Sequence, residues 1–152
     1  MPGVRKVGIL GDGRIARAVA FFFNTIPGCR AALLSSDVQA RGCDLLVGAL
    51  AGDLGEKCLA LALRYTKNLI DISDVDPPYY LKHKKKIAAR GITVIPGCGF
   101  SPGLTNFILG SEFALLQNRP SVTVKAGSLS KKREYYPFLW CFEDLILEIG
   151  RA

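Results

Sequence analysis

A glycine-rich turn near the N-terminus has the spacing of a phosphate-binding loop. Gly11, Gly13 and Ala16 form a GxGxxA pattern within the segment GDGRIA. The first glycine permits a sharp turn, the second leaves room for a pyrophosphate, and the alanine lets a helix pack closely on a sheet. Backbone N–H groups at the start of that helix, together with Arg14 and Ile15, would face the anion. The turn predicts a site for NAD(H) or NADP(H), although the same glycines would also suit a plain tight turn.

The adenosine ribose of such a ligand is expected at the tip of the second strand, where the sequence reads Ser35, Ser36, Asp37. Serines with Arg41 or Arg30 nearby would suit the 2′-phosphate of NADP. Asp37 would instead suit the ribose hydroxyls of NAD. The serines favour NADP slightly, and both cofactors stay open.

Two segments follow later strands and carry further candidates. Ala49 and Leu50 begin a turn of small residues where a nicotinamide ribose commonly passes in this architecture, although a tight turn explains them equally well. An acidic group, made of Asp71, Ser73, Asp74 and Asp76, comes after the fourth predicted strand. Asp74 is the candidate to bind an amine or relay a proton, whereas Asp76 better fits the cap of the next helix.

The most distinctive segment is PGCGFSPGLTN, residues 96–106, a glycine-rich turn that opens a helix. Together with the upstream NLIDISD, the longer GITVIPGCGFSPGLTN resembles the saccharopine dehydrogenase family, including members of the saccharopine reductase and carboxynorspermidine synthase type. The resemblance implies hydride transfer between a nicotinamide cofactor and a secondary amine or imine of an amino-acid-like small molecule. It places Cys98, Gly99 and Phe100 beside the nicotinamide, with Ser101 and Asp74 as catalytic candidates.

The elements that position these residues alternate between strand and helix. Apolar runs predict strands over residues 4–10, 31–34, 44–50, 68–73 and 92–96. Helical periodicity follows the first strand at Ile15, Val19, Phe22 and Phe23. Further helices are expected over 53–67, 78–90 and 103–117. Their core-facing residues are expected to include Leu54, Tyr80, Leu81, Ile87 and Ala88. Such alternation predicts an α/β fold with a Rossmann-type, doubly wound parallel sheet. The connection from Ser36 to Asp44 is too short for a full crossover helix and predicts a turn.

Beyond residue 102 the regular alternation of strand and helix ends. We expect residues 1–102 to form the NAD(P)-binding domain and residues 103–152 to form part of a substrate or dimerisation domain, the start of a truncated second domain. A strand over 122–126 and an aromatic stretch over 135–142 belong to this part. Exposed Trp140 and Phe142 would favour a homodimer.

Bulk composition narrows the class of protein. The chain has 152 residues, 49% of them hydrophobic, which argues against intrinsic disorder. Its apolar runs are shorter than the ~20 residues of a spanning helix, so we expect a cytoplasmic protein without a membrane partner. The five cysteines are odd in number and form no CxxC pair, so no disulfide framework or metal site is predicted.

The net charge of +7 allows an acidic partner, and its densest block is Lys82–Lys86. Because this block lies in a predicted helix and no nucleic-acid motif accompanies it, we expect a solvated helix face rather than a nucleic-acid-binding surface. Two function classes remain: an oxidoreductase of the saccharopine dehydrogenase type, and a cofactor-binding remnant or regulatory module without turnover.

Overall fold

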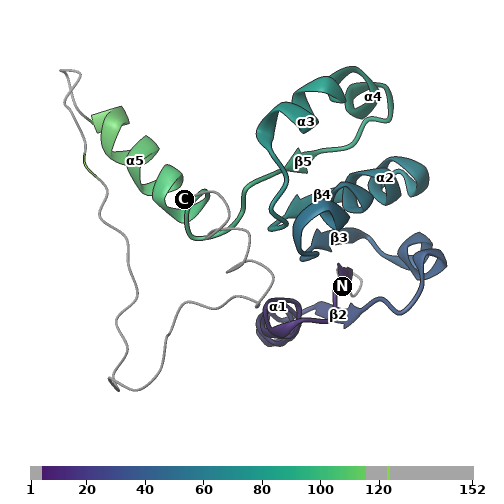
Figure 1. The fold of residues 1–152 in the computed structure, drawn as a ribbon. Coiled ribbons are helices and arrows are strands. Elements are labelled where there is room, and N and C mark those ends of the chain that lie inside the picture. The colour runs from purple at the N-terminus through teal and green to yellow at the C-terminus, as the bar shows by residue number, and fades with distance from the viewer. Residues whose placement is uncertain (1–4, 116–122, 124–152) are drawn as a thin grey trace. The chain divides into compact units, whose positions relative to one another are not determined.

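The computed structural model describes residues 5–115 and Thr123. Its centre is a sheet of parallel strands in the order β2-β1-β3-β4-β5 (Figure 1). The strands are β1 (Arg5–Leu10), β2 (Cys29–Leu33), β3 (Leu45–Gly48), β4 (Asn68–Asp71) and β5 (Val94–Ile95). The predicted Rossmann-type α/β fold is therefore confirmed.

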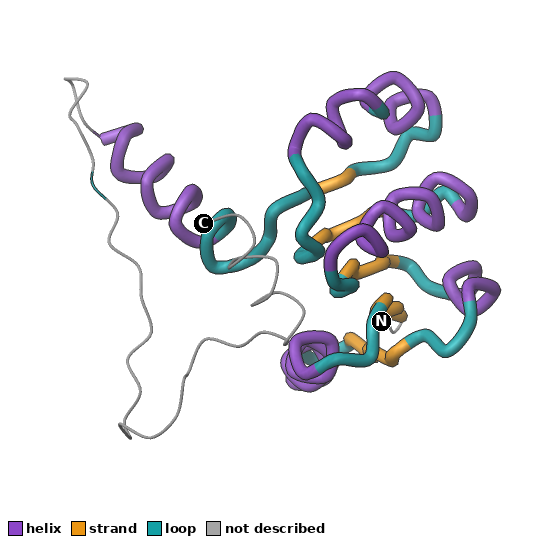
Figure 2. Tube along the Cα trace, viewed as in Figure 1, coloured by secondary structure: helices purple, strands orange, loops and turns teal. Residues whose placement is uncertain are grey.

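Helices alternate with these strands along the chain (Figure 2). They are α1 (Arg14–Thr25), α2 (Glu56–Tyr65), α3 (Pro77–Lys82), α4 (Lys84–Ala89) and α5 (Leu104–Leu115), with short 3-10 helices η1 (Asp37–Gly42) and η2 (Gly52–Gly55). The predicted reduction of the second crossover to a turn is confirmed by η1, a 3-10 helix of six residues.

Two apolar clusters, one on each face of the sheet, hold the fold together. On one face Val7, Ile9 and Val47 pack with Ala16 of α1. On the other, Leu46 and Leu69 pack with residues of α2 and with Tyr80 of α3. Because both faces are covered along β1, β3 and β4, these strands read as nearly continuous apolar runs in the sequence.

Several local expectations were wrong. The helix predicted over 78–90 is divided at His83, whose ring nitrogen lies 2.9 Å from the Tyr79 carbonyl oxygen, while its backbone N–H donates to Tyr80 instead. The side chain of Leu81 is 70% exposed, and Ala88 is also exposed. The helix predicted from residue 53 begins at Glu56 after η2, which leaves Leu54 exposed.

Helix α1 is also less buried than its periodicity predicts. Only Ala16 is fully buried, and Phe22 is 64% exposed beside an exposed Phe21. The two rings meet edge to face, with centroids 5.5 Å apart. The strand predicted over 122–126 and the aromatic stretch over 135–142 lie outside the described residues.

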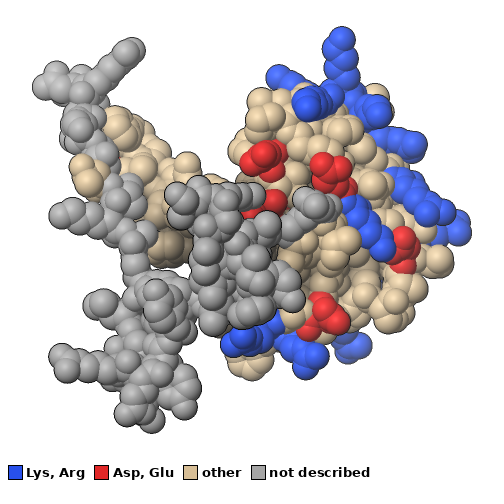
Figure 3. Space-filling model, in the orientation of Figure 1, with Lys and Arg blue, Asp and Glu red and all other residues tan. Residues whose placement is uncertain are grey.

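The described residues 5–115 fall in one compact unit, which includes α5, and the domain boundary at residue 102 stays a prediction. Among the described helices, none has the length and apolar character needed to cross a membrane. The lysines of the basic block are exposed on α3 and α4. In Figure 3 positive side chains gather at the upper edge of the view, where Figure 1 places these helices.

Candidate functional site

The site begins where the strand order reverses. The chain passes from β1 to β2 on one side, and then returns past β1 to β3, β4 and β5 on the other. The turns that follow β1 and β3 therefore lie side by side at the carboxyl edge of the sheet, joined by a hydrogen bond from the Ala49 N–H to the Leu10 carbonyl oxygen at 2.8 Å. In open α/β sheets this is the position at which ligands bind.

Gly11 and Gly13 serve different purposes in this turn. Gly11 has a φ of +125°, and a Cβ at this position would collide with the Ala49 carbonyl oxygen. Gly13 has a φ of −69° and faces open space, since an added Cβ would have no protein atom within 4 Å. The protein's own packing therefore requires glycine at residue 11 but leaves the space beside residue 13 free for a ligand.

Helix α1 starts at this open position. Gly13 is its N-cap residue, no side chain caps it, and its first turn carries no acidic residue. The first N–H groups of a helix need partners from outside the helix, and the helix dipole favours an anion there. Arg14 is exposed at the same end, while Ile15 is half-buried. This arrangement fits a pyrophosphate and would be disturbed by a side chain at residue 13.

A hollow adjoins the turn and is lined in part by the predicted site residues. Its two adjoining parts have volumes of about 190 and 410 Å³. Their lining includes Gly11, Ser35, Ser36, Asp37 and Leu50. The fold thus brings together predicted residues from the ends of three neighbouring strands. Ala49 belongs to the same turn as Leu50, although it is not part of the lining.

A lysine in the lining was not predicted from the sequence. Lys57 reaches the hollow from the first turn of α2, and its Nζ lies 3.0 Å from Oδ1 of Asp37. Arg30 and Arg41, the cations expected near the ribose, are absent from the described lining of either part. No local pattern marks Lys57, because its position depends on how α2 packs against the connection after β2.

The tip of β2 is organised by Gln39. Its Oε1 accepts hydrogen bonds from the Ser35 N–H at 2.8 Å and the Ser35 hydroxyl at 3.2 Å, with a longer one from the Ser36 N–H at 3.4 Å. In return the Gln39 N–H donates to the Ser36 side chain, which completes a capping box at the start of η1. The donors of Ser35 are therefore occupied within the protein.

The turn after β5 lies at the same edge of the sheet. The Cys98 N–H donates to the Asp71 carbonyl oxygen at the end of β4, at 2.9 Å. Gly99 and Gly103 approach so closely that a Cβ on Gly103, whose φ is +136°, would collide with the Gly99 carbonyl oxygen. Phe100 is 59% exposed, and Ser101 and Asp74 are exposed. No hydrogen bond joins Ser101 to Asp74 in the described chain, and neither residue lines the hollow.

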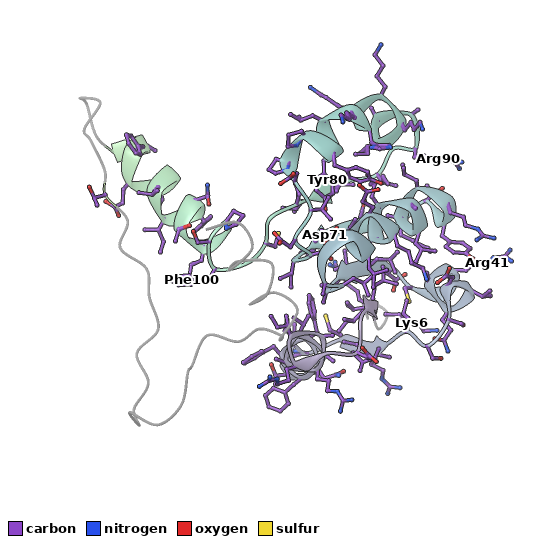
Figure 4. The ribbon with its side chains drawn as sticks, viewed as in Figure 1. Lys6, Arg41, Asp71, Tyr80, Arg90 and Phe100 are labelled. Carbon is purple, nitrogen blue, oxygen red and sulfur yellow. The ribbon has the colours of Figure 1, made fainter. Side chains whose placement is uncertain are left out.

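A buried carboxylate, Asp71, lies beneath these turns, whereas the sequence favoured Asp74 as the functional carboxylate. Asp71 is fully buried and accepts hydrogen bonds from the Tyr80 hydroxyl at 2.7 Å and from the Ser73 N–H at 2.9 Å. The Ser73 hydroxyl oxygen accepts a hydrogen bond from the Leu50 N–H at 3.1 Å. Asp71 and Tyr80 lie side by side in Figure 4, joining β4 to α3. This cluster fixes the turn after β3, which lines the hollow.

Two titratable neighbours of Asp71 are held in their neutral forms. Burial, the hydrogen bond and the charge of Asp71 raise the pKa of Tyr80. Burial and the charge of Asp71 raise the pKa of the Cys58 thiol to about 12, and its sulfur lies 3.7 Å from the Ser73 hydroxyl. Both groups therefore keep their protons at neutral pH.

The Cys58 shift predicts how stability depends on pH. An unfolded thiol titrates near pH 8.5. Between about pH 9 and pH 12 the unfolded chain has lost a proton that the folded chain retains, so stability falls as pH rises. We expect Cys58→Ala to make this decline shallower by about 1.4 kcal/mol per pH unit. Urea unfolding at several pH values above 9 measures the slope, and equal slopes for both proteins would contradict the shift.

Comparison with known proteins identifies the fold. The chain matches no protein-family model and no curated protein sequence. Among solved structures it is similar to apo saccharopine dehydrogenase (L-Glu forming) from Saccharomyces cerevisiae, with 16% identity and a TM-score of 0.61 over 73% of this chain. It is also similar to scyllo-inositol dehydrogenase from Lactobacillus casei, with 15% identity and a TM-score of 0.55 over 74% of this chain.

A third similar structure is an engineered D-amino acid dehydrogenase bound to NADP+, with 20% identity and a TM-score of 0.56 over 74% of this chain. The chain spans 31% of the saccharopine dehydrogenase and 40% and 41% of the other two. These similarities show that it has the Rossmann-type fold found in these dehydrogenases.

Proposed function

We propose that this chain contains the NAD(P)-binding domain of an oxidoreductase of the saccharopine dehydrogenase type. The observation that carries the proposal is the uncapped start of α1 at the reversal of strand order, with free space beside Gly13. An anion at this position would accept hydrogen bonds from the free N–H groups and would be stabilised by the positive end of the helix dipole. The adjoining hollow offers room for the adenosine half of a dinucleotide.

Each part of the cofactor has candidate residues. Arg14, Ile15 and the glycines of the turn would hold the pyrophosphate, and Ser35, Ser36 and Asp37 would surround the adenosine ribose. Ala49 and Leu50 would lie along the nicotinamide ribose, with Cys98, Gly99 and Phe100 beside the nicotinamide. When bound, the cofactor supplies a hydride donor or acceptor.

The proposed substrate class rests on the resemblance of residues 68–74 and 91–106 to the saccharopine dehydrogenase family. A secondary amine or imine of an amino-acid-like molecule needs a carboxylate or hydroxyl that holds its nitrogen and exchanges its proton. We assign these roles to Asp74 and Ser101, which follow β4 and β5 at the edge of the sheet that carries the hollow. Both residues are exposed.

The second candidate function is cofactor binding without turnover, and the exposure of Asp74, Phe100 and Ser101 favours it. Catalysis requires the reacting carbon to be held against the nicotinamide, and such positioning contributes about 7–11 kcal/mol. The described residues leave this side of the site open to solvent.

We therefore expect the purified chain to bind NADPH or NADH without oxidising it at an appreciable rate. A steady-state assay with a panel of amino acids paired with aldehydes or keto acids measures this. Turnover near the ~10 s⁻¹ typical of enzymes would establish catalysis by this chain and exclude the binding-only candidate. A chain that binds neither cofactor would contradict both candidates.

A further inference from the structure

An ion pair between Lys57 and Asp37 lies at the end of the hollow where the adenosine ribose is proposed to bind. Lys57 and Asp37 both line it, one from α2 and the other from the start of η1. Their charged atoms are 3.0 Å apart, and their side chains are 53% and 43% exposed. Of the residues that line the 190 Å³ part, Lys57 is the one cation and Asp37 the one anion.

The pair matters because NAD and NADP differ in charge at this place. An unpaired carboxylate beside the ribose accepts its hydroxyl groups and repels a 2′-phosphate. A free cation has the opposite preference. The net charge that Asp37 and Lys57 together present therefore decides which cofactor is favoured.

Other candidates for this selection are less well placed. The Ser35 N–H and hydroxyl already donate to Gln39, so a 2′-phosphate would have to compete for them. Arg41 lies on η1, and Arg30 on β2, but neither lines the hollow. Lys57 remains the cation that meets the adenosine ribose in this arrangement.

We propose that Lys57 determines the choice between NADP(H) and NAD(H) by neutralising Asp37, and that it contacts the 2′-phosphate. This inference rests on the proposed cofactor site. Lys57 admits the phosphate because its charge cancels the repulsion from Asp37. Removal of either partner leaves the other unopposed, so the two removals shift the preference in opposite directions.

The test compares Lys57→Met and Asp37→Asn with the unaltered chain, using dissociation constants for NADPH and NADH from fluorescence titration. We expect Lys57→Met to lower the preference for NADPH over NADH about tenfold, and Asp37→Asn to raise it about tenfold. Both changes should shrink as salt is added, because exposed charges are screened. Arg41→Met removes a positive charge outside the lining and is the control, with an unchanged preference.

Because the readout is a ratio of two affinities for the same protein, a general loss of stability does not imitate it. Equal weakening of both cofactors by Lys57→Met would overturn the inference and leave the proposed function intact. A shift by Arg41→Met as large as that by Lys57→Met would also overturn it. If the unaltered chain bound neither cofactor, the proposed function would fail and the inference with it.

Discussion

Gly13→Asp is expected to abolish cofactor binding, weakening the affinity for NADPH and NADH by at least about 100-fold, while the chain stays folded. The new carboxylate would occupy the open space beside Gly13 and repel the pyrophosphate at the start of α1. Asp is also a favourable N-cap residue, somewhat better than Gly, so the helix itself should not be weakened. Fluorescence titration measures the affinity, and thermal unfolding measures the stability.

Gly42→Asp is the matched control for this experiment. Gly42 also has open space at its Cβ position and no positive φ, but it lies at the end of η1, outside the lining of the hollow. It introduces the same charge and should leave cofactor affinity nearly unchanged. Undiminished affinity in Gly13→Asp, or equal losses in both variants, would show that the pyrophosphate does not bind at this turn.

Gly48→Ala is expected to destabilise the fold by at least about 2 kcal/mol. Gly48 lies opposite Asp71 in the register of β3 and β4, and an added Cβ would overlap the Asp71 carboxylate and press on the Cys58 sulfur. The carboxylate would have to move away from its hydrogen bonds to Tyr80 and Ser73. The free energy of unfolding in urea measures the loss.

Gly110→Ala provides the opposite case with the same chemical change. Gly110 lies within α5, and an added Cβ meets no other atom there, so alanine should stabilise the helix by up to about 1 kcal/mol. If Gly48→Ala instead left the free energy of unfolding within about 0.5 kcal/mol of the unaltered chain, the buried carboxylate would not be packed as described.

The sequence predicted the elements whose signals are local. An apolar run, a glycine turn and helical periodicity were enough to place β1, the turn and α1. The short connection from Ser36 to Asp44 was enough to predict that η1 replaces a full helix. These features depend on neighbouring residues only, so the alternation of strands and helices along the chain and the position of the Gly11 turn could be predicted from the pattern.

What the sequence did not predict depends on contacts between distant segments. Lys57 and Asp37 are joined only when α2 packs beside η1, and Asp71 is buried only because Tyr80 and Gly48 accommodate it. Asp71 was not singled out because four polar residues lie within positions 71–76, and nothing in their types indicates which side chain points inward. The break at His83 was missed because the competing hydrogen bond comes from its own side chain.

Backbone amide shifts during an NADPH titration of the isotopically labelled chain test the cofactor site most directly. We expect the largest shifts at Gly11–Ala16, with others at Ser35–Asp37 and at the Ala49–Leu50 turn, because these groups surround the proposed pyrophosphate and ribose positions. The basic surface of Lys82–Lys86 should change little. Shifts confined to that basic surface, or none at millimolar NADPH, would contradict the account.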